Sequence, residues 1–258
     1  MTLAGDLEPR AVFGEAWDRV FGPAIAHRGL WSPTGAPENS LGAFQAACSH
    51  DYGIELDVQL SADGEALVFH DSRLERMTGA EGRFSDHTAA ELTQLRLAGT
   101  DETIPTLSET LALVGHRAMV LIELKTTAGD VGALEKRVHE VLIDHNGPTA
   151  VIGFNPYSHG WFAQHHPKVL RGLNSHAYAD EGAMKMAPEQ RKAFAALEQV
   201  SIAKPHFLAL GVDMLPSAKA AAMRRGGMPV VAWTLRSAAE WDGLREHCDN
   251  LIFEGFAA

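Results

Sequence analysis

The stretch from Ile54 to Asp71, IELDVQLSADGEALVFHD, alternates apolar and polar residues and then ends in a short apolar run. A period of two is typical of a β-strand, and the dipeptide Asp63-Gly64 suits a tight hairpin turn. We therefore predict two antiparallel strands, with Asp57 opposite His70. Glu55 and Asp57 are two residues apart, so their carboxylates leave the same face. Taken alone, the segment fits a solvent-exposed hairpin face equally well.

Short apolar runs recur along the rest of the chain and alternate with segments of helical periodicity, which is typical of a parallel sheet built from βα units. The nine predicted strands are Ala24–Ala26, 54–60, 66–69, Ala118–Leu124, Thr149–Phe154, Val169–Leu173, Phe207–Val212, Pro229–Leu235 and Leu251–Phe253. One predicted helix begins after a cap at Asn39 or Ser40. The other predicted helices cover Thr88–Leu95, Leu107–Val114, Asp130–His145, 156–165, Pro216–Arg225 and Ser237–His247. The pattern predicts a distorted α/β barrel of the (β/α)8 type, with one extra hairpin strand and a helical insertion near residues 175–200.

The first 22 residues differ from the rest in having helical periodicity without a following strand. Apolar residues there recur at helical spacing, at Val12, Phe13, Ala16, Trp17 and Val20. We expect residues 1–22 to form an N-terminal arm that packs on the body, and residues 23–258 to form one barrel domain.

Composition narrows the classes of function. The chain has 258 residues, of which 46% are hydrophobic and 21% are charged, and its net charge of −11 argues against a nucleic-acid-binding surface. Cys48 and Cys248 lack metal-type spacing and are expected to be free thiols of a reducing compartment, although the sequence also allows one disulfide between them. The start of the chain has no apolar core run, and the sequence has no uninterrupted apolar stretch of ~18 residues, so we expect a cytoplasmic protein without a membrane span. The oligomeric state is not readable from the sequence.

Chemically useful residues cluster at the predicted strand ends, which share one mouth in such a barrel. Glu55, Asp57 and Glu123 give three carboxylates, and oxygen ligands of this kind suit Mg²⁺ or Ca²⁺. A histidine pair, His27 and His70, has the side chains needed for general acid and base catalysis. Two cations, Arg28 and Lys125, supply positive charge for a phosphate, although Lys125 also fits a structural ion pair with Glu123. Together these are the parts needed to hydrolyse a phosphodiester.

An ordered set of short motifs carries a resemblance to a known family. The motifs are HRG at 27–29, PEN at 37–39, ExD at 55–57, DG at 63–64, HD at 70–71, IPTL at 104–107, ExK at 123–125 and WT at 233–234. In this order the chain resembles the glycerophosphodiester phosphodiesterase family, which belongs to the superfamily of phospholipase C-like phosphodiesterases with a TIM-barrel fold.

The resemblance implies a metal-dependent hydrolase that converts a small glycerophosphodiester to glycerol 3-phosphate and an alcohol. It implies acid–base roles for His27 and His70, and one divalent cation, Mg²⁺ or Ca²⁺, held by Glu55, Asp57 and Glu123. Arg28 and Lys125 would then bind the phosphate, Trp233 is a candidate substrate platform, and Glu38, Asn39 and Asp71 would support these residues. Which histidine is the acid, and whether water or a substrate hydroxyl attacks first, stay open.

The chain departs from the family pattern at a few positions. Ser40 replaces a threonine, Gly153-Phe154 replaces Ser-Phe, Leu235-Arg236 follows the WT motif, and the closing motif ends in Glu254. We expect these changes to affect the rim and the choice of substrate, not the catalytic or metal-binding residues. One alternative is a phospholipase D-like activity on lysolipids, for which Met184 and Met186 would supply an apolar rim. Another is a non-catalytic barrel that binds phosphodiesters.

Overall fold

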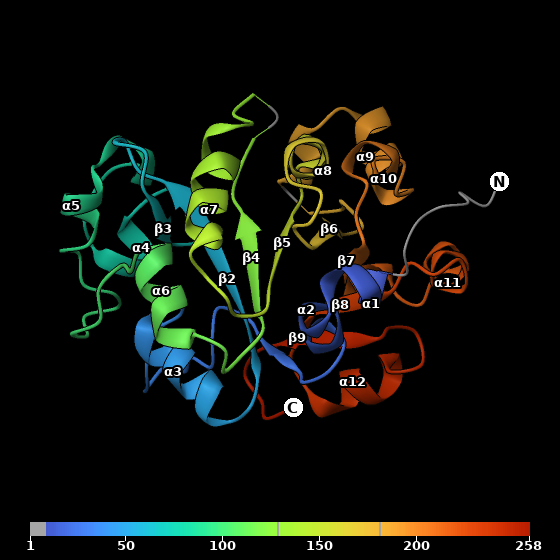
Figure 1. The fold of residues 1–258 in the computed structure, drawn as a ribbon, viewed down its shortest axis with the longest axis horizontal. Coiled ribbons are helices and arrows are strands. Elements are labelled where there is room, and N and C mark those ends of the chain that lie inside the picture. The colour runs from blue at the N-terminus through green and yellow to red at the C-terminus, as the bar shows by residue number, and fades with distance from the viewer. Residues whose placement is uncertain (1–8, 128, 181) are drawn as a thin grey trace.

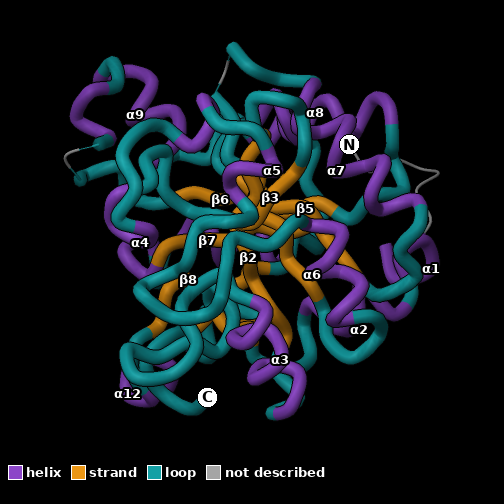
Figure 2. The backbone as a smooth tube through the Cα atoms, turned by 90° about the vertical axis from the view of Figure 1, so that its left-hand side faces the viewer, coloured by secondary structure: helices purple, strands orange, loops and turns teal. Residues whose placement is uncertain are grey.

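The strands form one closed barrel, and the helices surround it (Figures 1 and 2). The computed structural model describes residues 9–127, 129–180 and 182–258, so residues 1–8 of the predicted arm and residue 181 of the predicted insertion lie outside the described residues. The strands are β1 Ile25–Ala26, β2 Gly53–Leu60, β3 Ala66–Val68, β4 Val120–Leu124, β5 Thr149–Gly153, β6 Arg171–Ser175, β7 Phe207–Gly211, β8 Val230–Leu235 and β9 Asn250–Phe253.

Eight of these strands are parallel neighbours around the barrel. The order runs from β1 through β9, β8, β7, β6, β5 and β4 to β2, and β1 also pairs with β2, which closes the ring. The ninth strand, β3, is antiparallel to β2 and lies outside the ring. The predicted (β/α)8 barrel with one additional hairpin strand is therefore confirmed.

The helices lie close to their predicted positions and several begin at a polar cap. They are α1 Pro9–Phe13, α2 Glu15–Val20, α3 Leu41–Ser49, α4 Glu75–Thr78, α5 Ala89–Leu92, α6 Leu107–Val114, α7 Ala133–Ile143, α8 Pro156–His165, α9 Pro188–Ala195, α10 Val200–Ala203, α11 Ala218–Arg225 and α12 Ala238–Leu244. Ser40 caps α3, and Thr106 forms a capping box with Glu109 at the start of α6. Among the described residues, none of the helices has the length and apolarity needed to cross a membrane.

The register of the β2–β3 hairpin differs from the prediction by one residue. Val58 pairs with Val68, and the backbone N–H of Phe69 donates to the carbonyl of Asp57, so Phe69 and not His70 lies opposite Asp57. The cause is the turn: Ser61 pairs with Glu65 across three residues, and Gly64 adopts a positive φ of 86°. His70 therefore extends beyond the end of β3.

Alternation along the strands separates two apolar layers. Ile54, Leu56 and Val58 of β2 face the helices, as part of the large cluster between the barrel and its helical cover. Inside the barrel, a second cluster fills the lower part, with residues such as Leu121 and Ile252. Asp57 and Glu123 lie level with each other, one step beyond Leu121 in the inward-facing rows, and Glu55 precedes Asp57 on the same face of β2. The barrel therefore has an apolar floor beneath an acidic upper layer.

Two additions pack on this barrel. The N-terminal helices α1 and α2 place Phe13, Ala16, Trp17 and Val20 against the lower interior cluster, as the helical spacing predicts. Their division from the rest as a separate arm stays a prediction. The excursion between β3 and α6 has a small apolar core of its own around Phe69, Phe84 and other residues, namely Leu67, Leu74, Met77, Leu92, Leu97 and Ile104.

Close packing inside the barrel gives a first prediction. Gly172 of β6 lies directly opposite Phe207 of β7, and an added Cβ would overlap the buried Phe207 ring. We expect Gly172→Ala to destabilise the fold by about 1–3 kcal/mol because the ring has no free space to occupy. That corresponds to a loss of roughly 2–4 °C in melting temperature per kcal/mol.

The matched control is Gly243→Ala in helix α12, where an added Cβ would meet nothing within 4 Å and the position is exposed. This change should leave the melting temperature equal or slightly higher, because alanine favours the helix. Equal melting temperatures for Gly172→Ala and the unmodified protein would contradict the packing argument.

Candidate active site

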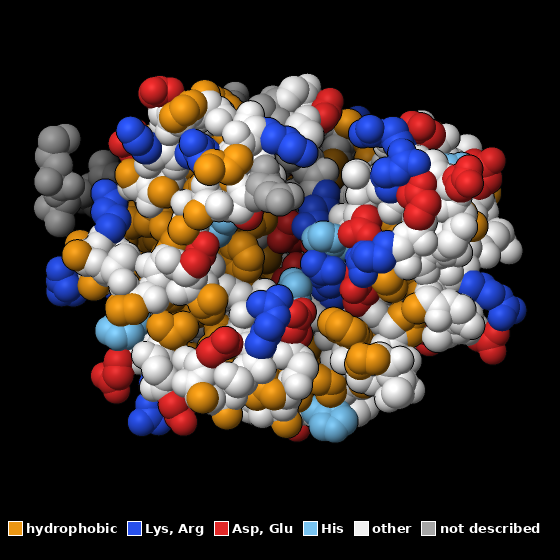
Figure 3. Space-filling model, turned by 180° about the vertical axis from the view of Figure 1, so that it is seen from behind, with side chains coloured by type: hydrophobic (Ala, Val, Ile, Leu, Met, Phe, Trp, Pro, Cys, Tyr) orange, Lys and Arg blue, Asp and Glu red, His pale blue; other side chains and the backbone are white. Residues whose placement is uncertain are grey.

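A pocket of about 260 Å³ opens at the C-terminal ends of the barrel strands. Every residue predicted to act in catalysis, phosphate binding or metal binding lines it: His27, Arg28, Glu55, Asp57, His70, Glu123, Lys125 and Trp233. Figure 3 shows one face of the molecule on which acidic, basic and histidine side chains gather around a hollow near the middle. Residues from strands far apart in the sequence therefore meet in one small space.

Strand register brings the three carboxylates together. Asp57 of β2 lies level with Glu123 of β4, and Glu55 projects from the same face of β2 as Asp57. One oxygen from each of the three carboxylates lies within 4.8 Å of the others. All three residues are buried, with at most 8% of their surface exposed. A tight group of oxygen ligands results, at the inner end of the pocket.

Backbone and amide groups orient these carboxylates. The backbone N–H of Arg28 donates to Glu55 Oε2 at 3.0 Å, and Asn39 Nδ2 donates to Asp57 Oδ2 at 2.8 Å. Asn174 Nδ2 donates to Glu123 Oε2 at 3.0 Å. Each carboxylate thus has a fixed direction before any ligand arrives.

Two cationic side chains, Lys125 and Arg28, lie close to the carboxylates. Lys125 Nζ lies 2.8 Å from Asp57 Oδ1 and 2.5 Å from Glu123 Oε1, and Arg28 Nε lies 3.4 Å from Asp57 Oδ2. Burial opposes ionisation of Asp57, but the charge of Lys125 and neighbouring cations holds its pKa well below the usual range. Burial and the charge of Asp57 raise the pKa of Glu55 to about 8.

This electrostatic imbalance fits a divalent cation. Three buried carboxylates share one ammonium and one guanidinium, and Glu55 is the carboxylate whose negative charge these cations would not balance, so its pKa is raised. A cation ligated by oxygen would offset that charge, and Mg²⁺ and Ca²⁺ prefer carboxylate oxygens. Glu55, Asp57 and Glu123 are therefore suited to hold such an ion.

Each of the two predicted catalytic histidines donates a hydrogen bond to a carboxylate. His27 Nδ1 lies 2.7 Å from Glu254 Oε2, and His70 Nδ1 lies 2.7 Å from Asp71 Oδ1. Because a carboxylate only accepts, the proton is on Nδ1, and Nε2 is the atom left for exchange with a ligand. His27 Nε2 lies 3.9 Å from Glu55 Oε2, at the edge of the carboxylate cluster.

The surroundings of the two rings have opposite electrostatic effects. Burial lowers the pKa of His27, but the hydrogen bond to Glu254 and the charge of Glu55 outweigh it, so the pKa is raised. For His70, burial dominates and the pKa is lowered, although the charge of Asp57 opposes this. The two imidazoles therefore differ in proton affinity within one pocket.

The predicted supporting residues lie just behind the pocket wall. Glu38 accepts hydrogen bonds from Arg28 Nη1 at 2.8 Å and from Arg76 Nη2 at 2.7 Å. The same Arg76 lies 2.5 Å from Asp71 through its Nε. Arg76 thus links the supports of Arg28 and His70, and it comes from the excursion after β3.

The structure adds site residues that the sequence argument missed. Glu254 holds His27 directly, so the expectation that this position affects only the rim is wrong: β1 and β9 are paired and bring the two residues side by side. Asn174 was missed because the strand was predicted to end at Leu173, whereas β6 continues to Ser175. Arg236 lines the pocket and pairs with Glu254 at 2.7 Å.

Trp233 forms part of the pocket wall and is held in place on two sides. Its Nε1 donates to the backbone carbonyl of Ala209 at 2.9 Å, and its ring packs edge-on against Phe154 at 5.6 Å between centroids. This placement is compatible with the predicted role as a substrate platform.

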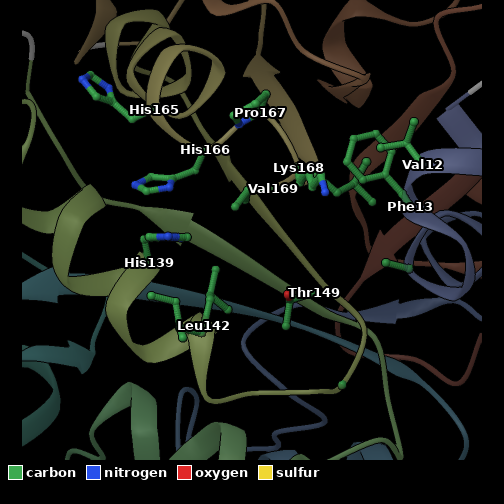
Figure 4. A pocket seen from close by; sticks show the side chains of 14 residues that line it. Val12, Phe13, His139, Leu142, Thr149, His165, His166, Pro167, Lys168 and Val169 are labelled. Carbon is green, nitrogen blue, oxygen red and sulfur yellow. The ribbon is translucent and has the colours of Figure 1, made fainter. Parts of the chain in front are cut away.

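A second hollow, of about 580 Å³, lies away from these strand ends (Figure 4). Its lining includes His139 and His166, whose rings stack with centroids 3.3 Å apart, and Val12 and Phe13 of α1. Thr149, at the start of β5, also borders it, so this hollow lies at the opposite end of the barrel strands. Catalytic sites of such barrels lie at the C-terminal ends, and the smaller pocket is therefore the candidate active site.

Comparison with known proteins identifies the family. The model of the glycerophosphoryl diester phosphodiesterase family matches residues 27–249. A glycerophosphodiester phosphodiesterase of Caldanaerobacter subterraneus is 37% identical over 146 residues, which cover 52% of this chain and 58% of that protein. Glycerophosphodiester phosphodiesterase 1 of Mus musculus is 32% identical over 60% of this chain and 49% of its own length. The matches thus span about half to three fifths of these relatives.

Solved structures extend the similarity over nearly the whole chain. A phosphodiesterase of Oleispira antarctica, solved in complex with the product sn-glycerol-3-phosphate, has a TM-score of 0.78 and 26% identity, covering 93% of this chain and 94% of that one. A glycerophosphodiester phosphodiesterase of Thermotoga maritima shares the fold, with a TM-score of 0.68, 24% identity and coverage of 90% and 94%. Because the family model matches most of the chain, from residue 27 to residue 249, the chain belongs to the glycerophosphoryl diester phosphodiesterase family.

Proposed function

We propose that this protein hydrolyses glycerophosphodiesters to glycerol 3-phosphate and an alcohol, with a divalent cation and with His27 and His70 as acid–base pair. One observation carries the proposal: two imidazoles, each held through Nδ1 by a carboxylate, line the same pocket as three clustered carboxylates. Family membership and the relatives' names support the same reaction.

The residues divide the work of the reaction as follows. One histidine accepts a proton through Nε2 as the attacking oxygen forms its bond to phosphorus, and the other donates a proton to the leaving alcohol oxygen as that P–O bond breaks. Arg28 and Lys125 bind phosphoryl oxygens and stabilise the charge that develops on them. A cation held by Glu55, Asp57 and Glu123 would polarise a phosphoryl oxygen.

The structure also bears on the two alternative functions, a non-catalytic phosphodiester-binding barrel and a phospholipase D-like activity on lysolipids. The paired histidines with free Nε2 atoms argue against a non-catalytic phosphodiester-binding barrel. For the lysolipid alternative, Met186 borders a hollow next to the pocket, whereas Met184 is 62% exposed and is not among the lining residues.

Hydrolysis of glycerophosphocholine, followed as release of glycerol 3-phosphate, is the direct test of the proposed reaction.

Metal removal should abolish turnover. The three buried carboxylates require more positive charge than Lys125 and Arg28 provide, so we expect EDTA to inactivate the protein and Mg²⁺ or Ca²⁺ to restore it. The rate is measured before chelation, after chelation and after each ion is added back. Full activity in thoroughly metal-depleted protein would remove the cation from the mechanism.

Loss of either imidazole should slow the reaction strongly. We expect His27→Ala and His70→Ala each to lower kcat by roughly 10²–10⁴, the usual range for a general acid or base. His116→Ala, at an exposed position outside the pocket lining, is the matched control and should keep the normal rate. A normal rate for either pocket variant would show that the residue is not catalytic.

Removal of the Lys125 charge should affect stability and catalysis in separable ways. Lys125→Met leaves Asp57 and Glu123 without their shared ammonium, so the metal-free protein should lose about 3–5 kcal/mol of unfolding free energy. Mg²⁺ or Ca²⁺ should reduce this loss, because the ion supplies the missing charge. With the ion present, kcat/KM should still fall by roughly 10²–10³, since the phosphate loses a cation.

The control is Lys136→Met, which removes an exposed lysine of α7. Thermal unfolding in EDTA and in the added ion, together with kcat/KM, separates the two roles. An unchanged kcat/KM in ion-saturated Lys125→Met would leave Lys125 with a structural role alone.

A further inference from the structure

A hollow of about 570 Å³ lies beside the candidate active site, and aromatic side chains form part of its largely apolar wall. We call it the aromatic hollow and define it by Phe154, Tyr157, Tyr178, Ala183, Met186 and Phe194. The first two come from the end of β5 and the start of α8, and the others come from the segment between β6 and α10. That segment is the predicted insertion near residues 175–200.

The aromatic hollow lies next to the catalytic pocket and shares Phe154 with it as a wall. Phe154 borders both spaces, and the consecutive residues Lys125 and Thr126 line one space and the other. Phe154 also packs edge-on against Trp233, which is a wall of the catalytic pocket. The part of a substrate that extends from a phosphate near Lys125 toward Phe154 would therefore point to the aromatic hollow.

The two spaces differ in chemistry. The catalytic pocket is small and lined with charged side chains, so it suits the phosphoryl group. The aromatic hollow has more than twice that volume, and Phe154, Met186 and Phe194 present half-buried apolar surface to it. Tyr157 at its edge is 52% exposed. Grouped apolar surface next to a catalytic site is the usual mark of a ligand subsite.

The other side of the pocket mouth suits the glycerol. There Arg236 borders both the catalytic pocket and a third hollow near Trp31, and its ion-pair partner Glu254 lines that third hollow. Charged groups at this position can bind hydroxyls, whereas the aromatic hollow offers mainly carbon and sulfur. The glycerol end of a phosphodiester is therefore better placed on the Arg236 side, with the leaving alcohol in the aromatic hollow.

We propose that the aromatic hollow binds the leaving alcohol, and that this protein prefers glycerophosphodiesters whose leaving alcohol carries an aliphatic or aromatic body. This inference rests on the proposed hydrolysis, in which water adds to phosphorus, the P–O bond to the alcohol breaks and the alcohol oxygen takes a proton. A fully buried methylene can contribute about fourfold to kcat/KM, so preference should grow with the length of the alkyl chain.

The test compares two synthetic substrates that differ only in the leaving alcohol, namely the ethyl and the octyl ester of sn-glycerol 3-phosphate. We expect the octyl ester to have a kcat/KM at least tenfold higher, measured below its aggregation concentration. Met186→Ser and Phe194→Ala should each reduce the octyl-to-ethyl ratio by threefold or more, because they remove apolar contact with the chain.

Met184→Ser is the matched control, since Met184 belongs to the same insertion but is exposed and does not line the hollow. Its octyl-to-ethyl ratio should equal that of the unmodified protein. An equal loss in Met184→Ser and Met186→Ser would overturn the proposal, because the effect would then come from the insertion as a whole.

The remaining outcomes separate this proposal from the one on which it rests. Hydrolysis of both esters with equal kcat/KM would overturn the role of the hollow and leave the hydrolytic function intact. Hydrolysis of neither ester would overturn the role of the hollow, and it would overturn the hydrolytic function as well where glycerophosphocholine is also left intact. Faster hydrolysis of a lysolipid, with an Met186→Ser effect confined to it, would place the hollow on the glycerol side and overturn the assignment to the leaving alcohol.

Discussion

Three carboxylates buried in the upper layer of a barrel are the constraint on which the rest of this structure depends. Removing carboxylates from water costs several kcal/mol per ion unless charge and hydrogen bonds compensate. Here the backbone N–H of Arg28, the amides of Asn39 and Asn174, and the ammonium of Lys125 provide part of that compensation. The apolar floor beneath keeps water out and strengthens each of these contacts.

His27 and His70 have the same kind of hydrogen-bond partners, although they follow different strands. His27 is held by Glu254, which pairs with Arg236, and His70 is held by Asp71, which pairs with Arg76. In each case an arginine neutralises the carboxylate that fixes the ring, so the proton on Nδ1 is retained and Nε2 is presented to the pocket. The small apolar core of the excursion after β3 gives Arg76 a stable base for this task.

Much of this arrangement could be predicted from the sequence, because local pattern determines it. The inward row of β2 and the lone acid of β4 are visible as an alternation and as a charge in an apolar run, and the parallel pairing of these strands then aligns Asp57 with Glu123. The hairpin register was missed by one residue because a three-residue turn replaces the two-residue turn that Asp63-Gly64 suggests. Turn length is set by contacts beyond the dipeptide.

The contacts made by closing the barrel could not be predicted from the sequence. Glu254 meets His27 only because β9 pairs with β1 across 227 residues, and no periodicity specifies which strands close a barrel. Asn174 escaped notice because the last two residues of β6 are polar and look like the start of a loop. Asn174 lines the pocket and Glu254 holds His27, and such polar side chains serve the site and weaken the apolar pattern that predicts a strand.

The mouth of the barrel is asymmetric, and the asymmetry follows from which loops border it. Loops after β8 and β9 bring Arg236 and Glu254, which are tied to His27 by charge. Segments after β5 and β6 bring Phe154, Tyr178 and Phe194, which contact one another or His176 through their rings. The strands between these loops hold the three carboxylates, and Arg28 and Lys125 lie just after strands of the same group. In the proposed reaction the rigid strands would therefore fix the chemistry, and the connecting segments, which can vary without disturbing the barrel, would set the choice of alcohol.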